Sequence, residues 1–351
     1  MNLFTVNANK AKTHIITCLE NGLVPFLSSS PGVGKSSIYK QIADDAGLVL
    51  IDIRLSQSES IDLKGYPDLM GKSEGTTQKA TYVPFDDIPV EGDPIPDGYN
   101  GFLVLLDEFN SAPRDVLAAA YKLVLDRYLG AHKVHEHCFI ATAGNLDTDN
   151  AITNEMGTAL QSRLIHLELE VDFITWLENV AIPNQYDERI IAFLNYQKSA
   201  LHNFTPDHTD KTYSSPRTRE FVNKYSNDYE DLELIAPLVV GTIGAVAGQD
   251  FISFTKVYSK LITLHDVLRD PETVDVPTKS AERWATITHL VKSASLDQVE
   301  DILTYIYRFP IEFVVLAGRM LISQHGSELQ QLKAYGQLIS KLGSVAVDTG
   351  A

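Results

Sequence analysis

A glycine-rich turn near the start of the chain has the residue types and spacing that hold a triphosphate. Residues 28–36 read Ser-Ser-Ser-Pro-Gly-Val-Gly-Lys-Ser, between an apolar run at 24–27 and a helical pattern at 38–46. A turn of this kind between a strand and a helix directs backbone N–H groups and the helix N-terminus at one point. Lys35 would contact the β- and γ-phosphates, and the Ser36 hydroxyl would bind Mg²⁺. The alternative is a surface turn with a chance Gly-Lys-Ser sequence.

The turn departs from the usual phosphate-loop pattern at Ser29, where the pattern has its first glycine. If this position requires a positive φ, serine is strained there and glycine is not. The predicted nucleotide contacts are the residues of the turn and of the helix start, namely Ser30, Pro31, Gly32, Val33, Gly34, Lys35, Ser36 and Ser37.

Two adjacent carboxylates, Asp107 and Glu108, follow the apolar run Phe102–Leu106. An aspartate at the C-terminal end of a strand can hold Mg²⁺ through water, and a neighbouring glutamate can polarise an attacking water. We therefore predict Ser36 and Asp107 as metal-binding residues and Glu108 as a catalytic residue. An acidic cap at the edge of a sheet is the alternative.

A third candidate, Asn145, follows the apolar run Cys138–Ala143. If this run is a strand beside the previous one, the Asn145 amide could hydrogen-bond both the γ-phosphate and the attacking water. A plain turn asparagine after Gly144 is the other interpretation.

The elements that must position these side chains alternate along the first half of the chain. Apolar, β-rich runs lie at Val24–Ser28, Leu48–Leu55, Phe102–Leu106, Cys138–Ala143 and Leu164–Leu169, and helical patterns lie at Ala8–Asn21, Lys35–Ala46 and Val116–Leu129. Strands that alternate with helices indicate a parallel sheet covered on both faces. We predict an α/β domain of five parallel strands over residues 1–171.

An insertion at 56–101 is too long for an ordinary connection between strands. Its segments 62–67 and 80–84 could pair as a hairpin, and the acidic, proline-rich stretch that follows has no basic residue among Asp86, Asp87, Glu91, Asp93 and Asp97. We favour a working loop beside the nucleotide site over a surface ornament, because long ordered loops tend to be functional.

From Asp172 onward the strand signals end and helical patterns take over. Helices are predicted at 172–180, 187–199 and 215–225. Two further sets of apolar residues each fall on one helical face: Phe251, Phe254, Tyr258, Leu261 and Ile262, and then Leu332, Tyr335, Leu338 and Ile339. We expect a helical lid at 172–225 and a C-terminal helical domain at 226–351.

The composition restricts the classes of binding partner and the cellular compartment that we expect. The 351 residues include 46 acidic and 29 basic side chains, for a formal net charge of −17. This balance disfavours general nucleic-acid binding and favours a protein partner. With two cysteines, no signal-peptide pattern at the N-terminus and no uncharged run long enough to span a bilayer, a cytoplasmic location is expected.

Two further sets of residues favour structural roles. His132, His135, His137 and Cys138 have the composition of a zinc site, but on a tight hairpin alternate residues face opposite sides and cannot converge. Trp176 and Trp284, at helical spacing among apolar neighbours, are predicted core residues.

The order of these features resembles the AAA+ ATPases, and among them the MoxR-like group of bacteria and their phages. The resemblance covers residues 24 to about 225. Its motifs are Pro-Gly-Val-Gly-Lys-Ser at 31–36, Leu-Leu-Asp-Glu-Phe-Asn at 105–110 with Ala-Pro at 112–113, Ala-Gly-Asn at 143–145, Leu-Gln-Ser-Arg-Leu at 160–164 and Ser-Pro-Arg-Thr at 215–218.

The resemblance implies a role for each motif. Lys35 and Ser36 would belong to Walker A, Asp107 and Glu108 to Walker B, and Asn145 would be sensor 1. Arg163 looks like an arginine finger that enters a neighbouring copy's site, and Arg217 in the lid looks like sensor 2. A salt bridge at the sheet margin is the alternative for Arg163, and an exposed helix-start arginine is the alternative for Arg217. Arg114 and Arg127 are further candidates for contacts between copies.

The resemblance also implies an activity. It points to a Mg²⁺-dependent ATPase that assembles into a hexameric ring and remodels a protein partner, often one with a von Willebrand factor A domain. The insertion at 56–101 corresponds to an extra hairpin that this group directs toward its substrate. A nucleic-acid motor or loader and a nucleotide-gated scaffold are the alternatives, and the C-terminal helical domain has no catalytic constellation.

Overall fold

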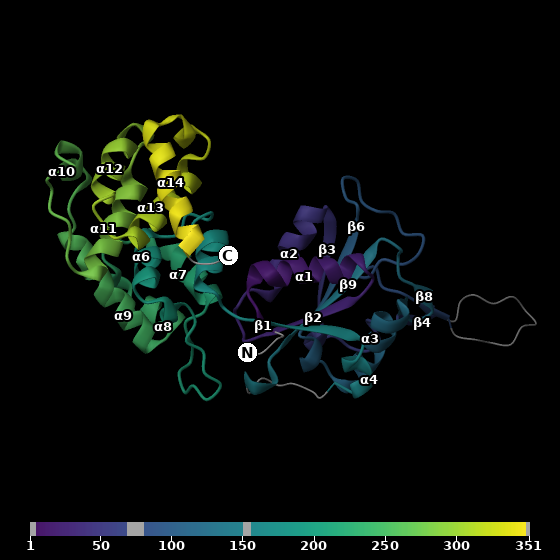
Figure 1. Cartoon of the computed structure of the whole chain (residues 1–351). Helices are drawn as coiled ribbons and strands as arrows, with labels where there is room; N and C mark the ends of the chain where they lie inside the picture. The colour runs from purple at the N-terminus through teal and green to yellow at the C-terminus, as the bar shows by residue number, and fades with distance from the viewer. Residues whose placement is uncertain (1–4, 69–80, 150–155, 349–351) are drawn as a thin grey trace, which may run out of the picture. The chain divides into compact units, whose positions relative to one another are not determined.

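The computed structural model describes residues 5–68, 81–149 and 156–348 (Figure 1). Its strands are β1 (Thr5–Val6), β2 (Val24–Ser29), β3 (Leu48–Arg54), β4 (Tyr66–Asp68), β5 (Thr81–Val83), β6 (Gly101–Asp107), β7 (Tyr128–Leu129), β8 (His132–Lys133), β9 (Cys138–Asn145) and β10 (Leu164–Leu169). Its α-helices are α1 (Ala8–Glu20), α2 (Lys35–Ala46), α3 (Arg114–Asp126), α4 (Thr158–Gln161), α5 (Phe173–Trp176), α6 (Glu188–Tyr196), α7 (Pro216–Ser226), α8 (Ala236–Ile243), α9 (Ala245–Thr255), α10 (Leu264–Arg269), α11 (Ser280–Ser293), α12 (Val299–Ile306), α13 (Ile311–His325) and α14 (Lys333–Asp348).

The main sheet has the strand order β1-β10-β2-β9-β6-β3, and all its neighbouring strands are parallel. The predicted α/β class is therefore confirmed, and all five predicted strands are present. The sixth strand, β1, adds two residues at the edge beside β10. Two residues are too few to give a strand pattern in the sequence.

Helices cover both faces of this sheet. Phe26, Val104 and Leu106 face one side, in a core shared with Val116 and Leu123 of α3. The alternate strand residues face the other side, in a core shared with α1 and α2, and they include Leu27, Leu103, Leu105, Ala141 and Ala143. This alternation is the two-residue period of a strand buried on both sides.

The insertion contains the predicted hairpin, since β4 pairs with β5 in antiparallel register. Ala80, which was also predicted to belong to it, lies outside the described residues. The predicted helix Val116–Leu129 is wrong at its end. Helix α3 stops at Asp126 because Arg127 takes a left-handed conformation with φ of 57°, and the chain then forms the β7–β8 hairpin.

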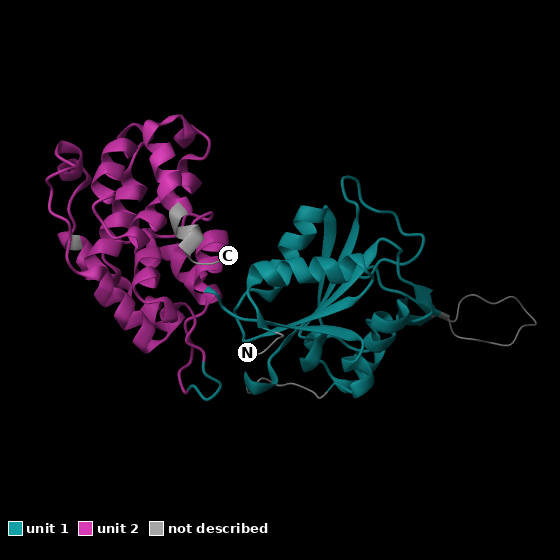
Figure 2. Ribbon diagram, viewed as in Figure 1, with its two compact units in different colours: residues 1–172, 205–208 teal, residues 173–204, 209–351 magenta. Residues whose placement is uncertain are grey.

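The chain divides into two compact units, which Figure 2 colours separately. The first comprises residues 1–172 and 205–208, and the second comprises residues 173–204 and 209–351. The described part of the second unit is helical. Within it, the division between a lid and a C-terminal domain at residue 225 stays a prediction.

Two predictions for the second unit have opposite outcomes. Trp176 and Trp284 are buried, as expected for core residues. The single helical face predicted from Phe251 to Ile262 is wrong, because α9 ends at Thr255 and a 3₁₀ turn follows. This turn brings the Tyr258 hydroxyl to 3.2 Å from the Glu188 carbonyl and 3.0 Å from the Thr288 hydroxyl.

Candidate functional site

The turn between β2 and α2 has the backbone of a phosphate-binding loop. Gly32 and Gly34 have φ of 79° and 109°, and α2 begins directly after Gly34 at Lys35. Positive φ is accessible to glycine without strain, so both glycines are needed where they stand. The first N–H groups of α2 lack partners within the helix and are directed toward the turn.

Ser29 fits this loop without the strain that a positive φ would impose. It is the last residue of β2, pairs with Asn145 of β9 and is not among the described non-glycine residues with positive φ. Its hydroxyl donates to the Ser30 carbonyl at 2.9 Å. The missing first glycine therefore does not disturb the start of the turn.

Lys35 and Asn145 approach each other at the end of the sheet. The Lys35 ammonium donates to the Ser29 carbonyl at 3.1 Å and to the Ser29 hydroxyl at 3.0 Å, and its Nζ is 3.5 Å from Asn145 Oδ1. All three side chains reach this point because β2 and β9 are neighbours and both end here.

Ser36 and Asp107 form the next contact along this edge. The Ser36 hydroxyl donates to Asp107 Oδ2 at 3.0 Å, and the backbone N–H of Glu108 donates to Asp107 Oδ1 at 2.8 Å. A hydroxyl and a carboxylate side by side are hard oxygen donors of the kind that Mg²⁺ prefers. The residues present therefore fit a magnesium ion.

Glu108 has an unusual backbone conformation at the end of β6. Its φ and ψ are 54° and 35°, in the left-handed region that non-glycine residues rarely enter. The Ser56 hydroxyl donates a hydrogen bond to Glu108 Oε2. Sequence reasoning missed Ser56, which comes from the turn after β3, because the sequence does not show that β3 lies beside β6.

Burial and like charge act on a further carboxylate near this edge. The pKa of Asp52 on β3 is raised, first by burial and then by the negative charge of Asp107, with a smaller contribution from Glu108 and an opposing one from Arg54. The carboxylates of Asp52, Asp107 and Glu108 are therefore close enough at this edge for their charges to interact.

The arginines predicted for contacts between copies differ in their surroundings. Arg163 is exposed, donates to the Ala159 carbonyl at 2.6 Å and lies 5.9 Å from the centre of the Tyr121 ring. Within the part of the chain that the structure describes, it forms no ion pair. Arg114 is exposed at the start of α3, whereas the Arg127 guanidinium donates to the Cys138 carbonyl inside the unit. Arg127 is therefore used internally.

Arg217 and Arg219 are two residues apart on α7 and have opposite environments. Arg217 is exposed, in the first turn after the capping box of Ser215 and Thr218. Arg219 is fully buried, bonds to Ser214 and to the Ala200 carbonyl, and burial lowers its pKa to about 9. Arg217 belongs to the second unit, whereas Lys35, Asp107 and the other predicted site residues belong to the first.

The histidine-rich hairpin has structural contacts. His132 Nε2 is 2.7 Å from the Tyr82 carbonyl, and His135 is buried with its ring 5.5 Å from that of Phe102. The described residues contain no group of three or more histidines, cysteines or carboxylates arranged to hold a metal ion.

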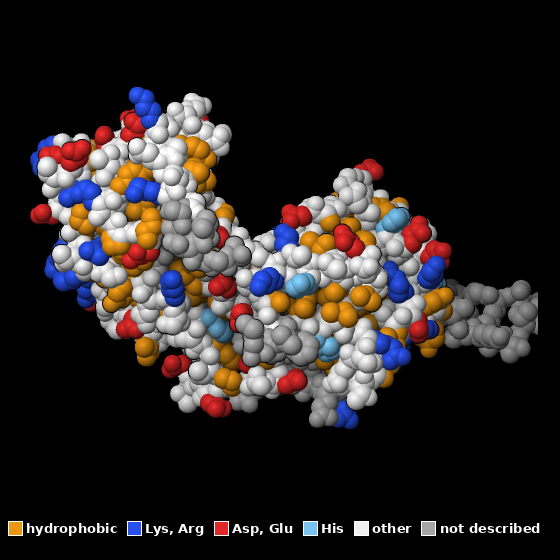
Figure 3. Space-filling view, in the orientation of Figure 1, with side chains coloured by type: hydrophobic (Ala, Val, Ile, Leu, Met, Phe, Trp, Pro, Cys, Tyr) orange, Lys and Arg blue, Asp and Glu red, His pale blue; other side chains and the backbone are white. Residues whose placement is uncertain are grey.

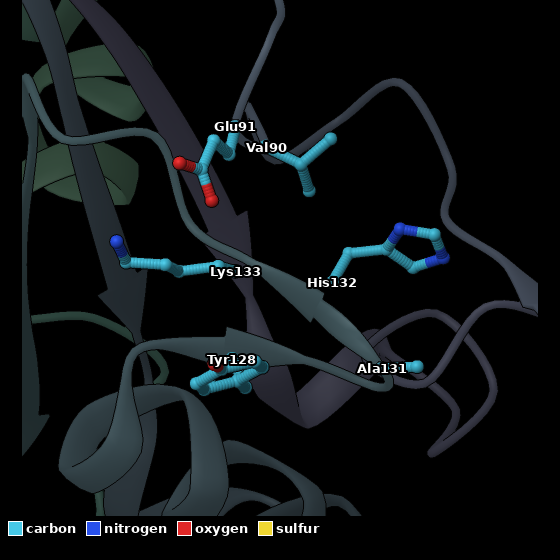
Figure 4. Close-up of a pocket in the computed structure, with 6 residues that line it drawn as sticks. All are labelled: Val90, Glu91, Tyr128, Ala131, His132 and Lys133. Carbon is cyan, nitrogen blue, oxygen red and sulfur yellow. The ribbon is translucent and has the colours of Figure 1, made fainter.

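A hollow of about 330 Å³ lies beside this hairpin (Figure 4). Its lining residues are Val90, Glu91, Tyr128, Ala131, His132 and Lys133. The backbone of the insertion meets the hairpin here, since the Glu91 N–H donates to the Lys133 carbonyl at 2.8 Å and Val90 bridges to Val134. None of the predicted site residues lines the hollow.

Comparisons with known proteins add little to this description. No family model and no curated protein matches the chain. Many solved structures match, and two of them are similar over most of its length. A candidate ATPase of Cytophaga hutchinsonii is 13% identical, with a TM-score of 0.36, over 97% of this chain and 90% of that one. A RuvB variant of Thermotoga maritima is 14% identical, with a TM-score of 0.32, over 96% of this chain and 89% of that one.

At such low TM-scores, the chemistry of the site rests on the residues of this chain. In the ranges covered by the structure, no helix combines the length and the apolar character needed to cross a bilayer.

Proposed function

We propose that the chain is an ATP-hydrolysing protein of the AAA+ type, similar to the MoxR-like group, that works as a ring of copies. One observation carries this proposal: Lys35, Ser36, Asp107, Glu108 and Asn145 meet at the C-terminal edge of one parallel sheet. Ligands of open α/β sheets bind at this edge, next to helix N-termini.

The turn at residues 30–37 would bind the triphosphate. Backbone N–H groups between Gly32 and Ser36, including those at the N-terminus of α2, would donate hydrogen bonds to the phosphate oxygens. Lys35 would then exchange its contacts with Ser29 and Asn145 for the β- and γ-phosphates, since an ammonium is attracted more strongly to anions than to neutral oxygens.

Ser36 would hold Mg²⁺ directly and Asp107 would hold it through water. The ion, when bound, neutralises charge that develops on the phosphates. The contact between the two side chains at 3.0 Å places both donors on one side of the site.

Glu108 and Asn145 would act on the attacking water from neighbouring strand ends. The Glu108 carboxylate would polarise the water and accept its proton, and the Asn145 amide would orient it and contact the γ-phosphate. Glu108 must leave the Ser56 hydroxyl, or share it with the water, for this to occur.

Arg163 would complete the site only in the assembled ring, whereas Arg217 would contact the γ-phosphate as sensor 2 of the helical lid. The exposed position of Arg163 leaves its guanidinium accessible to a neighbouring copy. An arginine supplied from a second molecule can accelerate hydrolysis by about 10³- to 10⁵-fold. We expect the monomer to be nearly inactive and a hexamer to be the working form.

The test is the specific ATPase activity with Mg²⁺ over a rising series of protein concentrations. It should rise as copies assemble, and Lys35→Ala should lower it by at least about 100-fold. Lys40→Ala, an exposed position on the same helix, should leave it unchanged. A specific activity that stays constant with concentration would contradict the shared site.

We propose that the remodelled partner is a protein and not a nucleic acid, because the net charge of −17 repels phosphate backbones. On the face drawn in Figure 3, Lys and Arg side chains are scattered among acidic and apolar ones. A partner with a von Willebrand factor A domain is the first to try. Stimulation of the ATPase by such a protein would support the proposal, and stimulation by DNA at moderate salt would favour a nucleic-acid motor instead.

A further inference from the structure

Asn110 joins two strand ends of the candidate site through its side chain. It lies in the 3₁₀ turn after β6 and is 2% exposed. Its Nδ2 donates to the Asn145 carbonyl at 2.8 Å, and its Oδ1 accepts from the Asn145 N–H at 3.1 Å. One buried amide thus holds both backbone polar groups of Asn145.

These two hydrogen bonds replace a strand ladder that has ended. Strands β6 and β9 pair from Phe102 with Cys138 as far as Leu106 with Thr142. Beyond that point β9 continues to Asn145 without β6 beside it, while Ser29 of β2 pairs with Asn145 on the other side. The Asn110 side chain therefore supplies the connection that the backbone of β6 no longer gives.

Gly144 leaves the room that this arrangement requires. A Cβ atom on Gly144 would overlap Asn110 Oδ1 and would lie 2.8 Å from the Phe26 ring. Any larger residue would displace the Asn110 amide or the ring. This is an observation independent of the hydrogen bonds, and it indicates that the close approach of Asn110 depends on glycine at this position.

We propose that Asn110 is a positioning residue that fixes Asn145 relative to Asp107 and Glu108. The proposal rests on the proposed ATPase function. Asn145 Oδ1 lies 3.5 Å from Lys35 Nζ, so the placement of its backbone determines where its amide meets the γ-phosphate. Asn110 is buried and would not itself touch the nucleotide; it would fix the distance from Asn145 to Asp107, which would hold Mg²⁺, and to Glu108, which would polarise the water.

A double-mutant cycle tests this role. Asn110→Ala should lower kcat by about 10- to 100-fold, because small displacements of a positioned group are costly, while the affinity for ATP changes by less than about 3-fold. In an Asn145→Ala background, the same substitution should lower kcat by less than about 2-fold further, since the group that it positions is gone. Equal losses in both backgrounds, with folded protein, would overturn the proposal.

Two further variants and one direct measurement cover the case in which Asn110→Ala folds poorly. Asn110→Asp keeps the side-chain size and the acceptor oxygen but loses the N–H donor. Gly144→Ala keeps Asn110 but adds a methyl group that displaces its side-chain amide. Both should show the same loss of kcat with retained affinity. Asn21→Ala, an exposed asparagine of the same unit, is the control and should change nothing.

Hydrogen exchange of the backbone N–H of Asn145 should be faster in Asn110→Ala by at least about 10-fold, because the Asn110 side-chain oxygen that accepts its hydrogen bond is removed. Unchanged exchange would refute the hydrogen-bond basis of the proposal. Absence of ATPase activity in the unmodified, assembled protein would refute the proposed function itself, whereas an active protein with additive losses would refute the positioning role alone.

Discussion

Each unit of the molecule contains a cluster of polar and charged side chains, and the two clusters differ in how their hydrogen bonds are used. In the second unit, Arg189 uses all five of its N–H donors: its Nε and Nη2 bond to Asp187, and its Nη1 and Nη2 bond to the Tyr229, Glu230 and Ser226 carbonyls. Asp187 is 1% exposed. This cluster is saturated and closed to ligands.

The cluster at the sheet edge of the first unit is half-buried and held by contacts that a ligand can replace. Lys35, Ser36, Asp107 and Glu108 are all partly exposed, and each makes a hydrogen bond to a neighbouring side chain. In the second unit, no donor of Arg189 is left for a ligand, and removal of its carboxylate partner is costly, whereas the partly exposed groups beside the turn can exchange partners and take part in chemistry.

The largest expected effect is on hydrolysis in the first unit. Glu108→Gln should lower kcat by about 100-fold or more while ATP still binds, because the amide cannot accept the proton of the attacking water. Steady-state kinetics and the affinity for a fluorescent ATP analogue measure the two quantities. Glu136→Gln, at an exposed position of the same unit, is the control. If Glu108→Gln lowered the affinity for ATP as much as it lowered kcat, Glu108 would act in binding and not specifically in hydrolysis.

Breaking the saturated cluster should have the opposite signature. Asp187→Ala leaves the Arg189 guanidinium buried without its carboxylate, which we expect to cost about 3 to 5 kcal/mol in the free energy of unfolding. Urea denaturation measures it. Asp45→Ala, which removes the exposed ion pair with Lys12, should cost less than about 1 kcal/mol. Similar costs for both variants would show that burial does not separate the two pairs.

The same pair predicts a dependence of stability on acid. Burial alone raises the pKa of Asp187, but the hydrogen bonds and charge of Arg189 outweigh it and lower the pKa. Its stabilising contribution is therefore present above the ordinary aspartate pKa of about 4 and is lost as the pH falls through the lower, folded-state pKa. Between pH 5 and pH 2, the free energy of unfolding should change less with pH in Asp187→Asn than in the wild type. The same dependence on pH in both proteins would show that Asp187 does not supply this contribution.

The smallest expected effect concerns His289. The pKa of His289 is raised because its imidazole can donate a hydrogen bond to the Glu188 carboxylate, against the opposing effect of burial. Its contribution is present below the unfolded-state pKa of about 6.5 and is lost as the pH rises through the higher, folded-state pKa. His289→Gln should remove a pH-dependent contribution of about 0 to 1 kcal/mol. Melting temperatures of the wild type and of His289→Gln at pH 6 and pH 8 measure it. The same change in melting temperature between the two pH values in both proteins would contradict this role of His289.

The strands, the turn and the catalytic candidates could be predicted because their signals are local. Apolar runs followed by the glycine-rich turn, by Asp107 and by Asn145 indicate parallel strands whose ends meet. The contacts of Ser56 and Asn110 could not be predicted, because they depend on which strands are neighbours and where each ladder stops. Burial likewise separates Arg219 from Arg217, although the two lie in the same short motif.

The end of α3 shows the same limit. The helical pattern of Val116–Leu129 continues past Asp126, yet Arg127 turns the chain and donates to the Cys138 carbonyl. A tertiary hydrogen bond outweighs the local helical preference there. Arg127, a candidate for contacts between copies, therefore makes its contact within its own unit.

The most direct test of the account mixes two inactive variants, Glu108→Gln and Arg163→Ala. In a mixed ring, an Arg163→Ala copy supplies an intact Walker B pair and a Glu108→Gln neighbour supplies an intact arginine. The mixture should recover ATPase activity at roughly a quarter of the wild-type sites, where these copies meet in the right order. Activity no higher than that of either variant alone, with mixed assembly demonstrated, would contradict a site built from two copies.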